Sequence, residues 1–212
     1  MNKINLIGNF LGIDGYSRHL RGLANGLQEV GLDVRIDAPL TAQWERYVSD
    51  AEYNMLTKKF DPERISIMIG QPQYWLLALA EKPKHFWGFL VWEGDKIPTY
   101  WQQYIEDPRV EKILVPSAHT ANAIHNSYYC TKPIIIIPHG FNTAKLFPSP
   151  EPTTERPFTF IANKGWAAGM NDRGGIQFLL KAFDEEFTKK DNVLLKVKIN
   201  PSYNVPGWDL KK

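Results

Sequence analysis

Short apolar runs alternate along this chain with segments whose apolar residues recur at helical spacing. The runs are bounded by glycine, proline or polar residues, which is typical of strands buried on both faces of a sheet. Strands that alternate with helices through short connections run parallel and are joined by right-handed crossovers. The pattern therefore predicts an α/β fold with a Rossmann-like, doubly wound parallel sheet. The predicted strands are Lys3–Asn9, Leu32–Asp37, Arg64–Gly70, His85–Trp92, Lys112–Ser117 and Pro133–Gly140.

A proline-rich stretch divides this pattern in two. Residues 1–144 form the first predicted domain, and residues 145–157, with four prolines, form a stiff linker. Beyond it lie a strand, a helix and another strand, and one such unit buries too little apolar surface to stand alone. We expect residues 158–212 to be the incomplete beginning of a second domain. Its unpaired strand edge predicts contact with a second copy or a second subunit.

The overall composition excludes several classes of protein. The chain has 25 Lys and Arg residues against 23 Asp and Glu residues, so its charge offers no argument for binding nucleic acid. A single cysteine, Cys130, excludes an internal disulfide and suits a reducing compartment. No apolar run reaches membrane-spanning length. We expect a cytoplasmic protein, or one attached peripherally to a membrane, with no metal or cofactor.

Glycines separate the first predicted strand from its helix. They stand at Gly8, Gly12 and Gly15, where a helix N-terminus and bare amides favour a phosphate group. The alternative is a tight turn that needs glycine for its own conformation. A nicotinamide oxidoreductase is a further alternative, because Asp37 ends the second strand where a ribose-binding acid would stand. The strict G-x-G-x-x-G spacing of such enzymes is absent, however.

Four sequence blocks, in order, resemble one family of enzymes. They are "GNFLGIDGYSRHLRGLANGLQEVGLDVRI", "VWEGDKIPTYWQQYIEDPRVEKILVPSAHTANAI", "IIIIPHGFNTAKLFP" and "NDRGGIQFLLKAFDEEF". They are spread between residues 8 and 187 and resemble the retaining GT-B glycosyltransferases, particularly family 4. The third block is similar to the exit from the N-terminal domain, and the fourth to the helix start that opens the second domain. The resemblance implies two Rossmann-like domains, with the acceptor held by the first and a nucleotide-sugar by the second.

The resemblance also assigns residues to the donor phosphates. A diphosphate leaving group gathers negative charge as the glycosidic bond breaks, so its site needs cations and amide donors. Gly12, Gly15 and Tyr16 would face the diphosphate from the first domain. Lys164 stands where the family usually has a basic residue, and Arg173 matches the arginine of an Arg-Lys-Gly motif. Either side chain can make charge-assisted hydrogen bonds to phosphate oxygens.

Two residues are candidates for the catalytic site. Glu93 follows a predicted buried strand, where ligands of α/β proteins bind, and it can orient an acceptor hydroxyl. The alternatives are that Glu93 caps the next helix or pairs with Lys96. His139, in the third block, lies at the exit from the first domain, where it can reach a ligand. Its alternative role is that of a hydrogen-bonded structural histidine.

Four further residues are candidates for binding the acceptor. Asp14 and Arg18 flank the glycine loop, and their alternative role is that of solvated surface charges. Trp92 can stack on a sugar or fill the core. Ser117 follows a proline at a strand end, which makes it first of all a helix N-cap. The implied partners are a nucleotide-sugar and a sugar or lipid-linked acceptor.

The sequence departs from the family pattern at two points. Gly174 replaces the lysine of the Arg-Lys-Gly motif, which removes one cation from the donor site. The chain also stops before the two spaced glutamates that hold the donor sugar and ribose in the family. We therefore expect a hexosyl transferase by ancestry, with little or no activity from these 212 residues alone. The alternative is a non-catalytic acceptor-binding or partner subunit of the same ancestry.

Overall fold

The chain divides into two compact units, Met1–Phe147 and Pro148–Lys212. The structure is a computed structural model that describes residues 3–12, 14–143, 146–148, 157–163 and 174–198. No helix within these described residues has the length and apolar character needed to cross a membrane.

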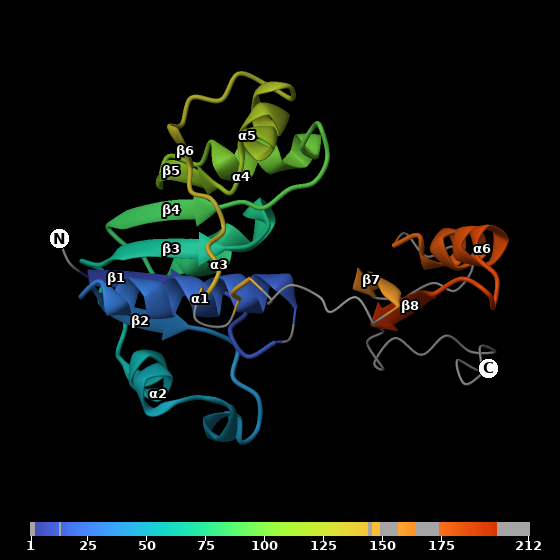
Figure 1. Cartoon of the computed structure of the whole chain (residues 1–212). Coiled ribbons are helices and arrows are strands. Elements are labelled where there is room, and N and C mark those ends of the chain that lie inside the picture. The colour runs from blue at the N-terminus through green and yellow to red at the C-terminus, as the bar shows by residue number, and fades with distance from the viewer. Residues whose placement is uncertain (1–2, 13, 144–145, 149–156, 164–173, 199–212) are drawn as a thin grey trace. The chain divides into compact units, whose positions relative to one another are not determined.

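A six-stranded parallel sheet forms the centre of the first unit, in the order β2-β1-β3-β4-β5-β6 (Figure 1). Its strands are β1 (Lys3–Ile7), β2 (Asp33–Asp37), β3 (Ile65–Ile69), β4 (His85–Phe89), β5 (Val110–Val115) and β6 (Ile134–Ile136). The helices between them are α1 (Gly15–Glu29), α2 (Asp50–Thr57), α3 (Trp75–Ala80), α4 (Gln102–Ile105) and α5 (Ala118–His125). The 3-10 turns η1 (Trp44–Tyr47), η2 (Pro72–Tyr74) and η3 (Thr99–Trp101) precede α2, α3 and α4.

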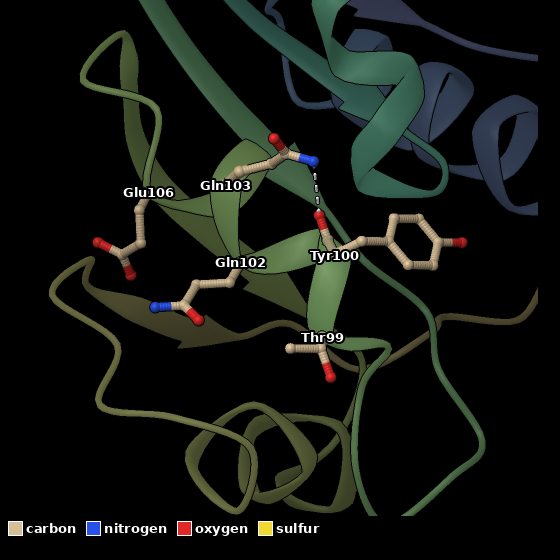
Figure 2. Close-up of a pocket in the computed structure, with 5 residues that line it drawn as sticks. All are labelled: Thr99, Tyr100, Gln102, Gln103 and Glu106. Carbon is tan, nitrogen blue, oxygen red and sulfur yellow. Dashed lines mark hydrogen bonds between the residues drawn. The ribbon is translucent and has the colours of Figure 1, made fainter.

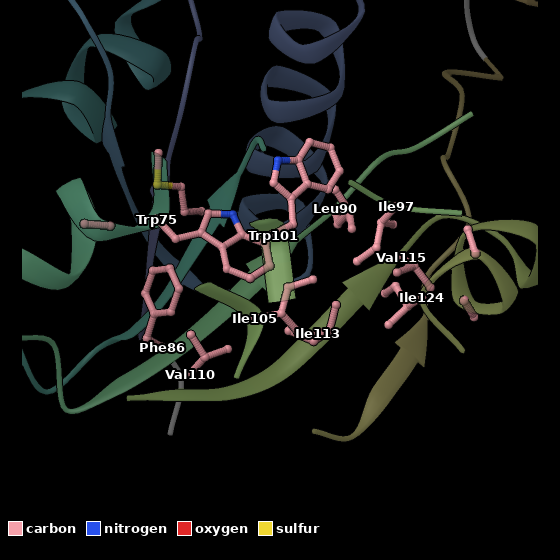
Figure 3. Close-up of a cluster of buried hydrophobic side chains, with 14 of the residues drawn as sticks. Trp75, Phe86, Leu90, Ile97, Trp101, Ile105, Val110, Ile113, Val115 and Ile124 are labelled. Atoms are coloured by element: carbon pink, nitrogen blue, oxygen red, sulfur yellow. The ribbon is translucent and has the colours of Figure 1, made fainter. Parts of the chain in front are cut away.

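Apolar side chains cover both faces of this sheet, because successive strand residues point to opposite sides. One cluster joins α1 and α2 to one face of the sheet; its buried members are Leu6, Phe10, Leu20, Ala24, Val34, Ile36, Met55, Ile67, Ile69, Phe89 and Leu114. The other cluster joins α3, α4 and α5 to the opposite face, and Figure 3 shows its large residues; they include Trp75, Phe86, Leu90, Trp101, Ile105, Ile113 and Ile124. The sheet is therefore doubly wound.

The closest packing in this second cluster joins β4 to α3. Gly88 lies under the buried Trp75 ring, and a Cβ on Gly88 would come within 2.3 Å of that ring. The Trp75 Nε1 atom donates to Gly70 O at 3.2 Å. Glycine at position 88 therefore serves packing, since any side chain there would displace the tryptophan.

The strand order places a topological switch point between β1 and β3. The chain leaves β1 for β2 on one side and then crosses to β3 on the other side. Ligands of open α/β sheets bind beyond the carboxyl ends of the strands at such a point. Because all six strands are parallel, the loops that follow β1, β3, β4, β5 and β6 begin at one edge of the sheet, which we call the carboxyl edge.

The second unit contains a pair of parallel strands joined through a helix. These elements are β7 (Phe158–Asn163), α6 (Ile176–Glu186) and β8 (Val193–Lys198). Phe160 of β7 contacts Phe183 and Phe187, with ring centroids 5.8 and 5.5 Å apart. Within the described residues, β7 and β8 hydrogen bond only to each other. This unit is the short α/β unit expected after the linker.

The predicted fold class is confirmed, with differences in the limits of single elements. The sixth strand was predicted over Pro133–Gly140, but β6 spans only Ile134–Ile136. Proline at each end of the apolar run limits strand pairing, because proline has no amide hydrogen to donate. The mixed region Thr41–Phe60 contains η1 and α2, as its partial helical pattern indicated. The predicted domain limits at residues 144 and 158 stay predictions.

Candidate functional site

The loop after β1 brings the backbone and polar side chains into close contact. Gly8 has a φ angle of +151°, and a Cβ there would lie 2.9 Å from Ile69 O at the end of β3. A Cβ on Gly12 would come within 2.6 Å of the polar tips of Asn9, Asp14 and Ser17. Gly8 is therefore required by its own backbone conformation and contact, whereas a side chain at Gly12 would displace the polar tips of the residues around it.

Asp14 caps the N-terminus of α1. Its Oδ1 accepts from Ser17 N at 3.0 Å, and its Oδ2 accepts from Ser17 Oγ at 2.9 Å and from Asn9 Nδ2 at 2.8 Å. Burial is the largest single influence and would raise the pKa of Asp14, but the hydrogen bonds from Ser17 and from the backbone of Asp14 and Tyr16 together outweigh it and hold that pKa below its usual range. The Asp14 carboxylate thus already accepts the hydrogen bond of a backbone amide in the first turn of α1, which a bound phosphate would otherwise accept.

Gly15 and Tyr16 begin α1 and lie open to solvent. A Cβ on Gly15 would meet no atom within 4 Å. Tyr16 is 36% exposed, and its pKa is raised by partial burial and then by the negative charges of Glu93 and Asp14. Those charges act on Tyr16 because the loop after β4 comes close to the start of α1. The structure therefore brings together three residues that the sequence assigned to different parts of the site.

Side chains of α5 and the turn after it hold the loop that carries Glu93. The His119 ring contacts Glu93 O at 3.0 Å, and Thr120 Oγ1 donates to Trp92 O at 3.2 Å. Asn126 Nδ2 donates to Asp95 O at 3.2 Å. Ile97 N donates to Ser127 Oγ at 2.9 Å. The backbone of this loop is thus fixed at several points, while the Glu93 side chain is exposed.

Trp92 and Ser117 make mainly structural contacts. The Trp92 ring packs edge-on against the buried Trp101, with centroids 4.8 Å apart, and its Nε1 donates to Lys96 O at 2.7 Å. Ser117 is the N-cap of α5, and its Oγ accepts from Thr120 N at 3.3 Å. Both residues lie at the carboxyl edge, but these contacts fit the core and capping alternatives. Their acceptor roles stay predictions.

His139 lies in a ring cluster with a residue that sequence reasoning missed. The His139 ring lies 4.1 Å from the ring of His19, centroid to centroid, and the His19 ring lies 4.6 Å from that of Phe89. Burial and the nearby His139 lower the pKa of His19 to about 4. His19 Nδ1 is buried and has no hydrogen-bond partner in the part of the chain that the structure describes. His19 directly precedes the buried Leu20 on α1. This neighbour was the one sign in the sequence that His19 lies partly inside the fold.

Of the other charged residues predicted for the site, those that the structure describes make few contacts that bear on a ligand. Arg18 is exposed on the first turn of α1. Lys164 and Arg173, the two predicted phosphate cations, lie outside the described residues. Asp37, the acid of the oxidoreductase alternative, forms an ion pair with Arg35 at 3.2 Å. The residues that meet at the carboxyl edge are thus acids, a tyrosine and two histidines.

A hollow of about 420 Å³ lies elsewhere on the first unit. Figure 2 shows its lining residues Thr99, Tyr100, Gln102, Gln103 and Glu106, which come from η3, α4 and the residue after α4. The Glu106 carboxylate accepts hydrogen bonds from Thr131 N and Oγ1. None of the predicted site residues lines this hollow. It therefore gives no support to the site assigned from the sequence.

Within the residues that the structure describes, no group of three or more His, Cys, Asp or Glu side chains could hold a metal ion. Comparisons of the chain with protein-family models, with curated proteins and with solved structures found no match.

Proposed function

We propose that this chain carries the acceptor-side half of a glycosyltransferase that moves a sugar from a nucleotide-sugar to an acceptor. One observation carries the proposal. Tyr16 and Glu93 lie close to each other at the carboxyl edge, and His139 contacts the helix that bears Tyr16. Each residue comes from a different block of the GT-B resemblance. Tyr16 lies near the charge of Glu93, and His139 contacts His19 on the same helix as Tyr16.

In the proposed reaction, the exposed carboxylate of Glu93 accepts a hydrogen bond from an acceptor hydroxyl and orients it. His139 lies on the chain that leaves the first unit, where it can reach the reacting sugar. The open surface of Gly15 at the start of α1 would admit the diphosphate. The family resemblance also assigns Lys164 and Arg173 to the donor phosphates. The proposed enzyme is retaining, in line with the family that the four blocks resemble.

The hydrogen bonds of Asp14 favour a second candidate function. Asp14 already accepts from Ser17 N and adds a negative charge at the point where a diphosphate would approach. Like charges repel, so this edge suits neutral hydroxyls better than phosphate. A non-catalytic acceptor-binding or partner subunit of the same ancestry is therefore the alternative.

Calorimetric titration of the chain with UDP, GDP, ADP and their sugar conjugates tests the proposal. We expect binding that prefers one base. Gly15→Val should weaken this binding at least about tenfold by filling the phosphate approach, and Arg173→Ala should weaken it by about tenfold by removing a charge-assisted contact. Gly22→Val is the matched control, because Gly22 is an exposed glycine of the same helix with no atom within 4 Å of an added Cβ.

Each outcome separates the two candidates. Unchanged affinity in both Gly15→Val and Arg173→Ala would overturn the phosphate assignment. If no nucleotide binds the unmodified chain, the donor role of this chain is wrong and the acceptor-binding alternative stands. If Gly22→Val weakens binding as much as Gly15→Val, the effect comes from the helix and not from the proposed site.

A further inference from the structure

Two stacked aromatic rings and one exposed tyrosine come from η1 and α2, the elements that follow β2. We call Trp44, Tyr47 and Tyr53 the aromatic shelf. The Trp44 and Tyr53 rings stack with centroids 5.4 Å apart and planes 15° from parallel. Tyr53 is 44% exposed and Tyr47 is 69% exposed. None of the three belongs to either buried cluster of the first unit, so packing of the core does not explain them.

Hydrogen bonds and an ion pair fix the shelf to the fold. Ser49 and Glu52 form a capping box at the start of α2, with Ser49 N donating to Glu52 Oε2 at 2.9 Å. Arg21 of α1 pairs with Glu52 Oε1 at 2.8 Å and donates to Tyr47 O at 3.0 Å. Glu52 is buried. A surface held in this way loses little conformational entropy when a ligand binds.

The same arginine links the shelf to the loop at the carboxyl edge. The Arg21 guanidinium lies over the Phe10 ring, 4.8 Å from its centroid, and Phe10 is fully buried in the loop after β1. The segment that bears Trp44 and Tyr47 also begins at the carboxyl end of β2. In Figure 1, α2 lies beyond β2, at one side of the sheet. The shelf thus extends the proposed site beyond the edge strand.

The chemistry of the shelf fits a carbohydrate. The face of an aromatic ring carries partial negative charge, which attracts the slightly positive C–H groups on the flat face of a sugar ring. The exposed neighbours Gln43, Glu45 and Arg46 offer donors and acceptors for sugar hydroxyls. One acid beside one base gives no net charge to attract a polyanion, so a nucleic acid is disfavoured.

We propose that the aromatic shelf binds a neutral oligosaccharide, with one sugar ring stacked on the Trp44–Tyr53 pair. This inference rests on the proposed function and deepens it, because it names an extended glycan as the acceptor, in place of a lipid or a small molecule. The growing end of the glycan would lie at Glu93, and the more distant sugars would lie on the shelf.

The test is a titration of the isotope-labelled chain with maltotetraose, cellotetraose and chitotetraose, followed by NMR. We expect one of these to shift the Trp44 indole signal and the backbone amides of residues 40–53. Trp44→Ala and Tyr53→Ala should each weaken that binding at least about tenfold. Tyr129→Ala is the matched control, since Tyr129 is 90% exposed and lies outside the shelf. Trp44→Phe, which keeps a ring, should retain part of the affinity and guards against a folding defect.

Several results would overturn the proposal. One is that none of the three tetrasaccharides binds, and another is that binding persists unchanged in Trp44→Ala and Tyr53→Ala. Concentration-dependent self-association that Trp44→Ala abolishes, without sugar binding, would assign the shelf to a contact between copies. The nucleotide titration above is independent of this test. Nucleotide binding without sugar binding would refute only the shelf, while sugar binding without nucleotide binding would refute only the donor role.

Discussion

The two edges of the six-stranded sheet use charged residues in opposite ways. At the amino edge, where the strands begin, Asp33 lies between Lys58 and Arg64, and Arg64 Nη2 is 2.5 Å from Asp33 Oδ2. At the carboxyl edge, Glu93 and Asp14 both act on Tyr16 by their negative charge, and His19 contacts His139. Opposite charges therefore pair around Asp33 at the amino edge, while at the carboxyl edge two negative charges lie near Tyr16 and two histidine rings contact each other.

This difference matches a division of the sheet into an edge that adds stability and an edge to which we assign the proposed function. Hydrogen bonds from Lys58 and Arg64 hold the pKa of Asp33 below its usual range, so the amino edge gains stability from its charges. The carboxyl edge keeps a buried imidazole nitrogen with no hydrogen-bond partner among the described residues, and an open glycine at the start of a helix. Arrangements that cost stability persist where a ligand can use them.

The largest expected effect is the loss of Arg64 at the amino edge. Arg64 is buried, and it also donates to Asp33 O at 2.7 Å. Arg64→Ala should lower the free energy of unfolding by about 2 to 3 kcal/mol, because it removes a buried partner of Asp33. Chemical denaturation followed by circular dichroism measures this. Lys84→Ala is the control, since its ion pair with Glu63 is exposed and should contribute about 0.5 kcal/mol. Equal losses in the two variants would contradict the contrast between a buried and an exposed pair.

A smaller effect is expected from pH at the carboxyl edge. The pKa of His19 is lowered to about 4 in the folded chain, whereas in the unfolded chain it has its ordinary value of about 6.5. Between these two pH values the unfolded chain therefore binds more protons at His19 than the folded chain does. Stability from neutral His19 is fully present above pH 6.5 and is lost as the pH falls toward 4. With allowance for partial solvent exposure, we expect a loss of about 1 to 2 kcal/mol. His19→Gln should flatten this part of the pH profile, whereas His125→Gln, on the exposed side of α5, should not. A profile that stays unchanged in His19→Gln would refute the assignment.

The smallest expected effect concerns the cap of α1. Asp14→Ala should destabilise the chain by about 1 kcal/mol, because Ser17 N loses its acceptor. Asp14→Asn keeps an oxygen at the cap and should recover most of that loss. Both variants remove a negative charge from the carboxyl edge, so both should strengthen nucleotide binding if the diphosphate lies there. Weaker nucleotide binding in Asp14→Asn would show that the carboxylate itself contacts the ligand.

Much of the fold could be predicted from the sequence because strands buried on both faces leave a strong pattern. The runs that became β1, β3, β4 and β5 are apolar on both faces, and each is bounded by residues that favour turns. The end of β6 was predicted too late, since the run of isoleucines continues past Ile136, whereas Pro138 and the pairing with β5 limit the strand to Ile134–Ile136. The strand order also depends on pairings between distant residues, which no local pattern contains.

The site could be predicted only in part, for a similar reason. The motif blocks placed Glu93, Ser117 and His139 after strands, and a parallel sheet brings such positions to one edge. The contacts of Gly12 with Asn9, Asp14 and Ser17 depend on how the loop folds back on itself. His19 was missed because its significance arises from His139, a residue 120 positions later in the chain.

Hydrogen bonds from α5 and from the turn after it hold the backbone of the 92–97 loop, and they limit which insertions and deletions this loop can accept. His119, Thr120, Asn126 and Ser127 each bond to the backbone of that loop, so an inserted or deleted residue there would break several bonds at once. In the segment 38–49 between β2 and α2, Ala38 and Val48 pack against the core, but residues 43 and 45–47 are exposed and can be exchanged without disturbing it. Under the proposed function, new acceptor preferences are therefore expected to arise through these exposed residues, while the loop with Glu93 keeps its length.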